Sequence, residues 1–367
     1  MHSSKKDEWR LIESLLPAGW RQAAREQRAF VRARYTSEPG PILRLLLFHA
    51  VNNTGLRETV AQARASGIAT MSQVGLLKRL RTSGGWLAWL AAGLCQSLRR
   101  PPPPVQGLKL RAIDSTTVQG PASKGTEWRV HYSVDLMTLN CDWCELTDEH
   151  GAELLERTPV QRGDVLLADR NYLRPAGVEA VVDAGAHVLV RLRWSHSPMI
   201  DQRGRRFQAL TRARRLKVGQ VGAWPVWLPV SQEKSIPARV VAIRLPAPLA
   251  AKAERRADRT SRHKGKQPDP RSLEAAHFVM LFTTVPQERL EAADVLDVYR
   301  FRWQIELAFK RLKQLLRLGH LPHKDPLAAQ SWILAKLVIA LLLETLYRNA
   351  RAFSPWGYDL NELAASS

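Results

Sequence analysis

Four consecutive prolines at residues 101–104 divide this chain of 367 residues into two parts with different hydrophobic patterns. Before them, apolar residues recur at helical spacing in four segments, namely residues 9–16, 42–52, 56–65 and 73–81. After them the period of the pattern changes to two. Because a proline run continues neither a helix nor a sheet ladder, we place a domain boundary there and predict an all-helical domain at residues 1–104.

The part of the chain that follows the prolines predicts a mixed sheet. Residues 108–114 form a buried apolar strand that ends in Asp114, and residues 164–169 form a second one that ends in Asp169. The other segments are strands at 128–138, 141–146 and 187–192 and helices at 152–157 and 175–184. This element order is typical of an α/β fold with an RNase H-like sheet and helices on both faces. We assign the first part of this core to residues 105–194.

Residues 195–285 interrupt the rhythm of the core. Short strands are predicted at 221–230, 238–245 and 277–285, and basic tracts occur at 203–217 and 252–266. A charged run is usually a solvated surface, but the basic character of the whole chain favours contact with phosphate. We predict a β-rich basic insertion here, after which the core resumes with C-terminal helices at residues 286–367.

The charge balance indicates a nucleic-acid partner. The chain has 55 Lys and Arg against 34 Asp and Glu, a formal net charge of +21 and a pI of about 10.6. Basic side chains that neutralise phosphates release counterions, so a surplus of this size is typical of proteins that bind DNA or RNA. Residues 55–67 and 71–81 have the order helix, glycine turn and basic helix of a DNA-reading helix-turn-helix. Plain helical hairpins share this order, so both interpretations stay open.

Cysteine usage and the chain's apolar segments bear on location. Three cysteines provide no disulfide framework, and the first seven residues lack an apolar signal segment. The longest apolar run, residues 337–343, is too short to cross a bilayer. We expect a soluble protein of a reducing compartment, without membrane contact.

Residues 299–313 carry the strongest functional pattern. If they form one helix, at about 100° per residue, a polar stripe lies along one face within roughly 60° and an apolar face that includes Phe301 lies opposite. The stripe and its continuation consist of Tyr299, Arg302, Glu306, Lys310, Lys313 and Arg317. Its single acid is either an i,i+4 ion pair with Arg302 or a metal ligand inside a phosphate-binding row.

Asp114 and Asp169 favour the metal interpretation of Glu306. A polar residue at the end of a buried strand is not there for packing, and these two strand ends are expected to lie close together beneath the helix that carries Glu306. Three converging carboxylates repel one another unless divalent cations compensate their charge. Two Mg²⁺ ions about 3.5–4 Å apart can activate a water or a 3′-hydroxyl for cleavage of a phosphodiester.

These three regions resemble the signatures of DDE transposases of the insertion-sequence-4 family. The matching segments are Leu110-Arg-Ala-Ile-Asp-Ser-Thr-Thr117, Leu166-Leu-Ala-Asp-Arg-Asn-Tyr172 and Tyr299-x2-Arg302-x3-Glu306-x6-Lys313. The last one matches the spacing of that family's Tyr-Arg-Glu-Lys signature in full. The resemblance covers about residues 40–347, including the strand-rich insertion.

The resemblance implies both a reaction and its site. Asp114, Asp169 and Glu306 would hold two Mg²⁺ ions, for which Mn²⁺ would substitute, while Tyr299, Arg302 and Lys313 would bind the transposon-end backbone. The family excises an insertion sequence at its terminal inverted repeats by hydrolytic nicking and joins the ends to target DNA. The partners would be double-stranded DNA and a second copy in a synaptic homodimer, in the bacterial cytoplasm at the nucleoid. An exposed Trp can stack a flipped base, and the candidates are Trp224, Trp227 and Trp303.

Two other functions remain open from the sequence. One is a catalytically inactive, transposase-derived regulator that only binds DNA, although such a protein has no use for acids among its bases. The other is an RNase H-like nuclease, which leaves the insertion unexplained.

Several acids and cysteines are weighed against this site. Turn or helix-start roles explain the acids that end no apolar strand, namely Asp135, Asp142, Asp148, Asp294 and Asp297. Cys141 and Cys144 have the spacing of half a zinc site, but strand alternation predicts that they lie on opposite faces. We therefore expect no metal there.

Overall fold

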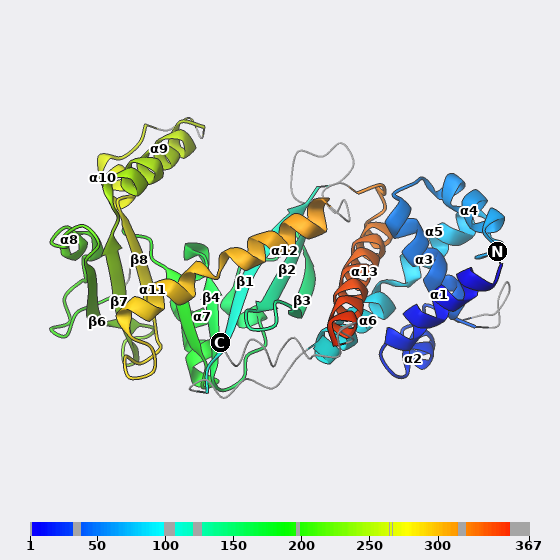
Figure 1. Ribbon diagram of the computed structural model, residues 1–367, viewed down its shortest axis with the longest axis horizontal. Helices are drawn as coiled ribbons and strands as arrows, with labels where there is room; N and C mark the ends of the chain where they lie inside the picture. The colour runs from blue at the N-terminus through cyan, green and yellow to red at the C-terminus, as the bar shows by residue number, and fades with distance from the viewer. Residues whose placement is uncertain are drawn as a thin grey trace.

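The computed structural model describes residues 2–31, 38–98, 107–119, 127–195, 199–263, 265, 267–314 and 321–352. Its helical end and its sheet lie side by side along the longest axis (Figure 1). The helices of the first part are α1 (His2–Leu15), α2 (Trp20–Glu26), α3 (Gly40–Asn52), α4 (Leu56–Ala65), α5 (Gln73–Thr82) and α6 (Gly84–Leu98). Four of these were predicted. The sequence pattern missed α2, which is only seven residues long, and α6, which has too few polar residues for a helical period.

The last described helix, α13 (Pro326–Ala352), completes the core of these first helices. It packs against α3, α5 and α6 (Figure 1), and Trp332 and Val338 on it are fully buried. Asp325 accepts a hydrogen bond from the Ala328 amide at 2.9 Å and so satisfies a free donor of its first turn. By length and composition, Pro326–Leu346 of α13 could cross a membrane, which among the described residues holds for this helix alone. Since 67% of its most apolar window is buried in the protein, we regard α13 as a core helix.

The rest of the described protein is built around one eight-stranded mixed sheet. Its strands, in spatial order, are β3 (Cys141–Asp148), β2 (Trp128–Asp135), β1 (Lys109–Val118), β4 (Asp164–Ala168), β5 (His187–Arg191), β8 (Phe278–Thr283), β7 (Ser235–Arg244) and β6 (Val221–Pro229). The pairs β1–β4 and β4–β5 are parallel, and all other pairs are antiparallel. The predicted strands are all present.

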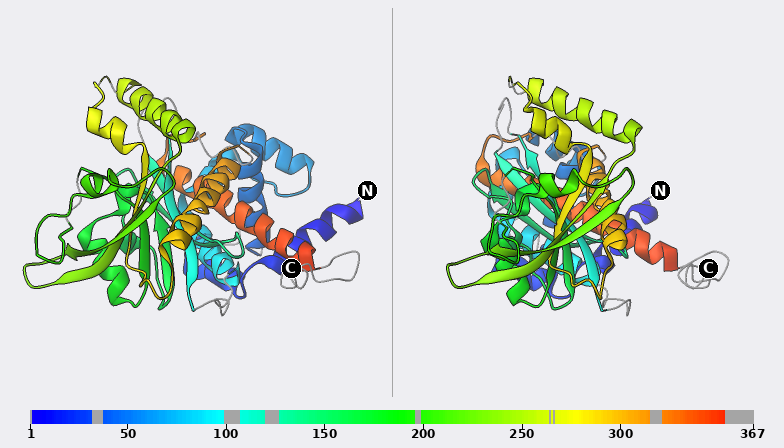
Figure 2. Two further views of the ribbon diagram at one scale, coloured as in Figure 1. Left: turned by 60° about the vertical axis from the view of Figure 1, so that its left-hand side comes forward. Right: turned by 90° about the vertical axis from the view of Figure 1, so that its left-hand side faces the viewer.

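Helices cover both faces of this sheet (Figure 2). Leu166 and Val188 belong to the core on one face, together with residues of α7 (Pro175–Asp183) and α8 (Ala209–Ala213). Their neighbours Val165 and Leu189 point to the other face, where they pack with α11 (Ala292–Arg300). Because β4 and β5 are buried on both faces, they are continuous apolar runs. Only a one-turn 3-10 helix, η1 (Leu155–Arg157), forms where a helix at 152–157 was predicted.

The strands of residues 195–285 extend the core sheet rather than forming a sheet of their own. β8 pairs with β5 through Leu189 and Thr283, and β7 and β6 follow outward. The helices α9 (Ala247–His263) and α10 (Pro270–Ala275) project from this end of the sheet (Figure 1). The three predicted strands of this segment are thus continuous with the core sheet, and the segment also contains α8, α9 and α10. The domain boundaries themselves remain predictions.

The predicted single helix over residues 299–313 is wrong, because two helices share this segment. α11 ends at Arg300 and α12 (Trp303–Gln314) begins after two intervening residues. Between them the backbone tightens into i→i+3 bonds, from the Arg302 amide to the Tyr299 carbonyl at 3.1 Å and from the Ile305 amide to the Arg302 carbonyl at 3.2 Å. The break allows α11 to pack on β6 and β7, while α12 crosses β1 and β2 (Figure 1). Phe301, predicted to be in the core, lies at the break and is 52% exposed.

Candidate active site

Asp114 and Asp169 lie on neighbouring strands at the same level of the sheet. The parallel register of β1 and β4 pairs Ala112 with Leu167, so two residues further on Asp114 is beside Asp169. Asp169 directly follows β4, as predicted. Asp114 is not at a strand end, as the sequence suggested, because β1 continues to Val118 through its pairing with β2. Beyond the end of β4, β1 is therefore open on one side at Asp114.

Arg302 connects Asp114 to Glu306. Its guanidinium lies 2.7 Å from the Glu306 carboxylate, through Nη2 and Oε1, and 3.7 Å from Oδ2 of Asp114 through Nη1. The Arg302 side chain is 18% exposed and that of Glu306 is 60% exposed. The predicted i,i+4 ion pair between Arg302 and Glu306 is thus present. Arg302 also lies near Asp114, one of the other two acids proposed from the sequence as metal ligands.

Tyr299 fixes the end of α11 next to the acids. Its hydroxyl donates to the Ala168 carbonyl at 3.1 Å, immediately before Asp169. Burial raises the pKa of Tyr299 to about 12, against the opposing effect of Arg302, so the hydroxyl stays a donor at neutral pH. The Arg302 guanidinium lies 5.9 Å from the centre of the Tyr299 ring. The helix break thus brings together Tyr299, Arg302 and Glu306, which the sequence placed along one helical stripe.

The acids of this site lack sufficient positive charge. Burial raises the pKa of Asp114 to about 6, and the carboxylates of Glu153 and Asp169 add to this effect. The Ser115 amide, which donates to Asp114 at 2.8 Å, and Arg302 lower the pKa but do not compensate. A divalent cation would supply the missing charge. Arg302 already places a cation between Asp114 and Glu306, so this donor set fits a metal ion.

The carboxylate oxygens of the three acids are too far apart to bind one metal ion together as they stand. Among the described residues, Asp114, Asp169 and Glu306 are not a group whose ligand oxygens all lie within 4.8 Å of one another. Asp169 is engaged locally, because its Oδ1 accepts a hydrogen bond from the Asn171 amide at 2.7 Å. A metal ion held by all three acids would therefore require a movement of their side chains.

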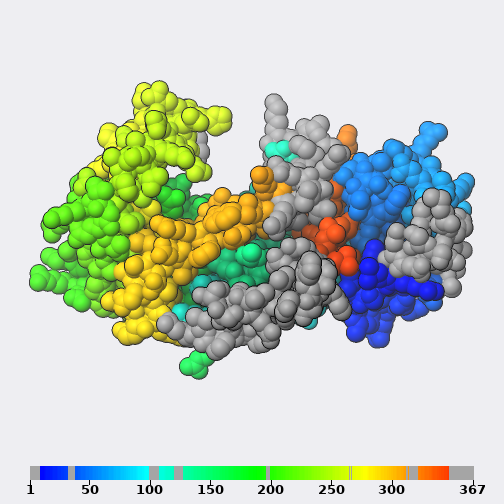
Figure 3. Space-filling view, in the orientation of Figure 1, coloured from blue at the N-terminus to red at the C-terminus, as the bar shows by residue number. Residues whose placement is uncertain are grey.

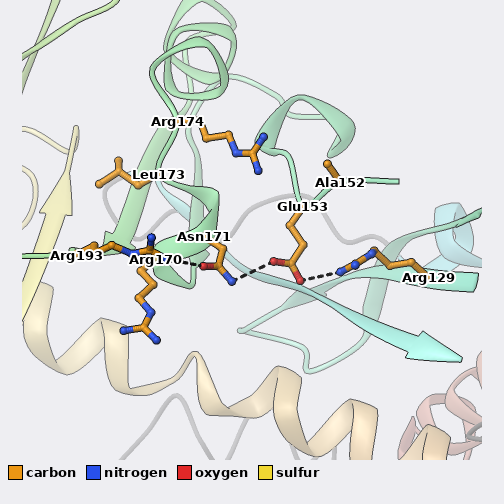
Figure 4. Close-up of a pocket in the computed structure, with 8 residues that line it drawn as sticks. All are labelled: Arg129, Ala152, Glu153, Arg170, Asn171, Leu173, Arg174 and Arg193. Carbon is orange, nitrogen blue, oxygen red and sulfur yellow. Dashed lines mark hydrogen bonds and ion pairs between the residues drawn. The ribbon is translucent and has the colours of Figure 1, made fainter. Parts of the chain in front are cut away.

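A pocket of about 490 Å³ lies beside these acids and was not anticipated from the sequence (Figure 4). At its centre Glu153 accepts hydrogen bonds from Ser115 at 2.8 Å, Arg129 at 3.0 Å and Asn171 at 3.3 Å. Four arginines line it, namely Arg129, Arg170, Arg174 and Arg193. Glu153 follows β3 in a loop with other acids, so no period or spacing distinguishes it. Of the residues that line this pocket, only Arg170 and Asn171 lie in one of the three segments that resemble the family signatures.

The other predicted DNA-contacting residues differ in how they lie. Lys310 and Lys313 are exposed on α12. Arg317 lies outside the described residues. In Figure 3 the α11 and α12 segments, coloured yellow to orange, form a continuous ridge across the face of the protein.

The three tryptophan candidates differ in their exposure and surroundings. Trp224 is half-buried and packs against Phe207, with ring centres 6.3 Å apart. Trp227 is half-buried on the same strand, β6, at the far edge of the sheet. Trp303 is 49% exposed at the start of α12, three residues before Glu306. It is the candidate with a free ring face next to the acids.

For Asp142, one of the remaining acids, the predicted turn or helix-start role is wrong. It is not a turn residue but is buried at 1% exposure, 2.7 Å from Arg111 and 3.0 Å from Lys109. Asp135 accepts from the Met137 amide in a turn, as predicted, and also lies 3.5 Å from Lys109. Asp148 lies in a turn and Asp294 in the first turn of α11, as predicted, whereas Asp297 lies in the middle of α11 and pairs with Arg300, so the prediction is wrong for this residue.

The two helices of the possible helix-turn-helix, α4 and α5, are present, but two of the basic side chains of α5 have partners within the protein. Arg79 donates to the Ala29 carbonyl at 3.0 Å, and Arg81 forms an ion pair with Asp325 at 2.7 Å. These contacts hold α5 against the helical core. The choice between a DNA-reading pair and a plain hairpin stays open.

Comparisons with known proteins show the family of this chain. A family model described as "Transposase DDE domain" matches residues 106–343. The chain is 35% identical over 338 residues to "Putative transposase InsL for insertion sequence element IS186A" of Escherichia coli (strain K12), covering 91% of both chains. It is 35% identical over 339 residues to "Transposase for insertion sequence element IS421" of Escherichia coli, again covering 91% of both. A chain of the piggyBac transposase synaptic complex with hairpin DNA overlays with a TM-score of 0.48 and 9% identity, over 94% of this chain and 74% of that one, which is too weak to support an inference.

Proposed function

Because this chain belongs to the DDE transposases, we propose that it cuts and joins DNA at Asp114, Asp169 and Glu306, with two Mg²⁺ ions held by these acids. Such ions activate a water or 3′-hydroxyl and stabilise the leaving oxygen of the phosphodiester. Mn²⁺, which accepts the same oxygen ligands, would substitute. The overall reaction is excision and integration of an insertion sequence at its terminal inverted repeats.

The observation that carries this proposal is the uncompensated charge around Asp114. Its pKa of about 6 reflects a buried carboxylate with two further carboxylates nearby, an effect that the Ser115 amide and Arg302 oppose only in part. When cations bind, Asp114 and Glu306 no longer need Arg302. The guanidinium is then available for a phosphate of the DNA, at the place where the strand is cut. Tyr299, which holds the end of α11 against β4, positions Arg302 for this exchange.

The DNA would approach over α12 and the arginine-lined pocket. Exposed cations on the ridge, Lys310 and Lys313, suit the phosphate backbone, and we place Arg317 in the same row. The four pocket arginines would offer further contacts to phosphate (Figure 4). Trp303 is the side chain that we propose to stack on an unpaired base.

We also propose the finer identity of the parts. The order β3-β2-β1-β4-β5, with three antiparallel strands followed by two parallel ones, supports an RNase H-like core. The spacing of Tyr299, Arg302, Glu306 and Lys313 supports membership of the insertion-sequence-4 family. The N-terminal helices would bind the terminal repeats, and a homodimer would hold the two ends together in the bacterial cytoplasm, at the nucleoid. A purely regulatory, inactive protein is not favoured, because all three acids lie around one site.

The test uses a duplex that carries the inverted repeats found beside the gene. Wild-type protein with Mg²⁺ should nick the 3′ end and join it to a target plasmid. We expect Asp114→Asn, Asp169→Asn and Glu306→Gln each to reduce cleavage more than 100-fold while gel-shift affinity for the same duplex changes little. Loss of a group that acts on the reacting atoms changes rate rather than binding.

Asp297→Asn is the matched control, because Asp297 is an exposed acid on α11 that pairs only with Arg300, at 3.2 Å. It should cleave at the wild-type rate. If Glu306→Gln also cleaved at that rate, the assignment of Glu306 would be wrong. Cleavage without any strand joining would instead identify a nuclease.

A further inference from the structure

Three cysteines from distant parts of the sequence meet in the core between α6 and β3. Sγ of Cys95 lies 3.7 Å from Sγ of Cys141 and 3.9 Å from Sγ of Cys144. All three sulfurs lie within 4.8 Å of one another, and no other trio of possible ligands in the described part of the chain is this compact. Cys141 is fully buried and Cys95 is 4% exposed. They are thus the whole cysteine content of the chain, gathered at one point.

A β-bulge makes this meeting possible. β3 pairs Cys144 with Tyr132 and Cys141 with Val134, so three steps on β3 face two steps on β2, and Asp142 is the extra residue. Tyr132 and Val134, two residues apart, share one face of the sheet. Their partners Cys141 and Cys144 therefore share that face too. The prediction that these cysteines lie on opposite faces is wrong for this reason.

The spacing of the sulfurs is that of a tetrahedral metal site. With a Zn–S distance of about 2.3 Å, two sulfurs of a tetrahedron lie about 3.8 Å apart. The observed 3.7 and 3.9 Å lie on either side of this value. We propose that Cys95, Cys141 and Cys144 bind one Zn²⁺ ion, which joins helix α6 to strand β3.

A fourth ligand is available from α13. The Glu344 carboxylate accepts hydrogen bonds from the Cys141 amide at 2.9 Å and from the Tyr132 hydroxyl at 3.1 Å. It is thus held beside the cluster, although not within 4.8 Å of all three sulfurs. Zn²⁺ accepts carboxylate oxygen or water as readily as thiolate at its fourth position. The site would then link α6, β3 and α13.

The thiols are prepared for this role. Hydrogen bonds from Cys141 and Cys95 lower the pKa of Cys144 well below its usual range, because they stabilise its thiolate. Burial and the neighbouring sulfurs raise the pKa of Cys141. Zn²⁺ would displace thiol protons to solvent, so its affinity should fall at low pH.

The test measures zinc in the full-length protein, purified without a histidine tag or chelator. Elemental analysis should give about one zinc per chain. Replacement by Co²⁺ should produce thiolate-to-metal charge transfer in the near ultraviolet and the visible bands of tetrahedral Co²⁺. Oxygen ligands at the catalytic acids give neither, so Asp114→Asn should retain zinc and the cobalt spectrum.

Cys144→Ser and Cys95→Ser should each lower bound zinc at least tenfold. Val130→Ala is the matched control, because Val130 is fully buried in the same core on β2 but offers no ligand. It should keep its zinc. Wild-type protein that takes up no zinc, holds copper instead, or contains a disulfide would overturn the proposal, as would full zinc in Cys144→Ser. The first three of these results are measured on the wild-type protein, so they test the proposal even if the variants fail to fold.

Discussion

Asp114→Asn should stabilise the metal-free protein although it removes a catalytic acid. The Asp114 side chain is 22% exposed, and burial raises its pKa from 3.8 to about 6. The folded protein therefore binds this proton more tightly than the unfolded chain, and the ionised carboxylate destabilises the fold. At 1.36 kcal/mol per pKa unit, the effect above pH 6 is at most about 3 kcal/mol. Asn keeps the shape of the side chain and the oxygen that accepts from the Ser115 amide.

The gain in stability from Asp114→Asn should depend on pH. Below pH 3.8 the carboxyl is protonated in both states, and the destabilisation grows as the pH rises from 3.8 to about 6. Asp114→Asn should therefore raise the free energy of unfolding by about 3 kcal/mol at pH 7.5, but only by about 1 kcal/mol at pH 4.5. Both values are upper limits, because the structure around an ionised group relaxes.

The assay is urea unfolding in EDTA, followed by tryptophan fluorescence. Asp148→Asn, an exposed acid at the end of β3, is the control and should change stability little at either pH. Added Mg²⁺ should narrow the difference, because the wild type binds the ions and is stabilised by them. A loss of stability in Asp114→Asn at pH 7.5, or an equal gain at both pH values, would refute the reasoning.

Two further predictions concern buried charges away from the acids. Asp142→Ala should cost about 3–5 kcal/mol, since it leaves the buried Arg111 and Lys109 with fewer partners, whereas Asp148→Ala should cost less than about 1 kcal/mol in the same urea assay. Equal costs would contradict the importance of this cluster. Burial lowers the pKa of His49 from 6.5 to about 4, so stability is complete above pH 6.5 and is lost as the pH falls toward 4. Between pH 7.5 and pH 5, His49→Gln should lose about 2 kcal/mol less stability than the wild type, and parallel pH curves would exclude this role.

Local patterns were sufficient to predict most elements of the fold. Alternating or apolar runs marked every strand, since burial on one or both faces of a sheet leaves a direct trace in the sequence. The candidate acids were chosen because Asp169 ends an apolar run and Glu306 stands alone among bases. The strand boundary at Asp114 was wrong, but the choice of this residue does not depend on it, because an acid in an apolar strand is unusual wherever the strand ends.

What the sequence did not reveal depends on neighbours distant in the chain. The break at residues 301–302 follows from the need of α11 and α12 to pack on different strands, and nothing in the segment itself requires it. The bulge at Asp142 is determined by pairing with β2, so alternation misplaced Cys144. Glu153 acquires its role only from Ser115, Arg129 and Asn171, which approach it in the fold.

The packing of α13 among α3, α5 and α6 has a consequence for synthesis. On the ribosome, the first helices emerge more than two hundred residues before the helix that completes their core. Until then Leu43 and Leu46, which are fully buried in the finished protein, lack part of their cover. A chain that stops before residue 326 would retain Asp114, Asp169 and Glu306 but expose this apolar surface to chaperones and proteases. Truncated copies should therefore be removed from the cell before they can act on DNA.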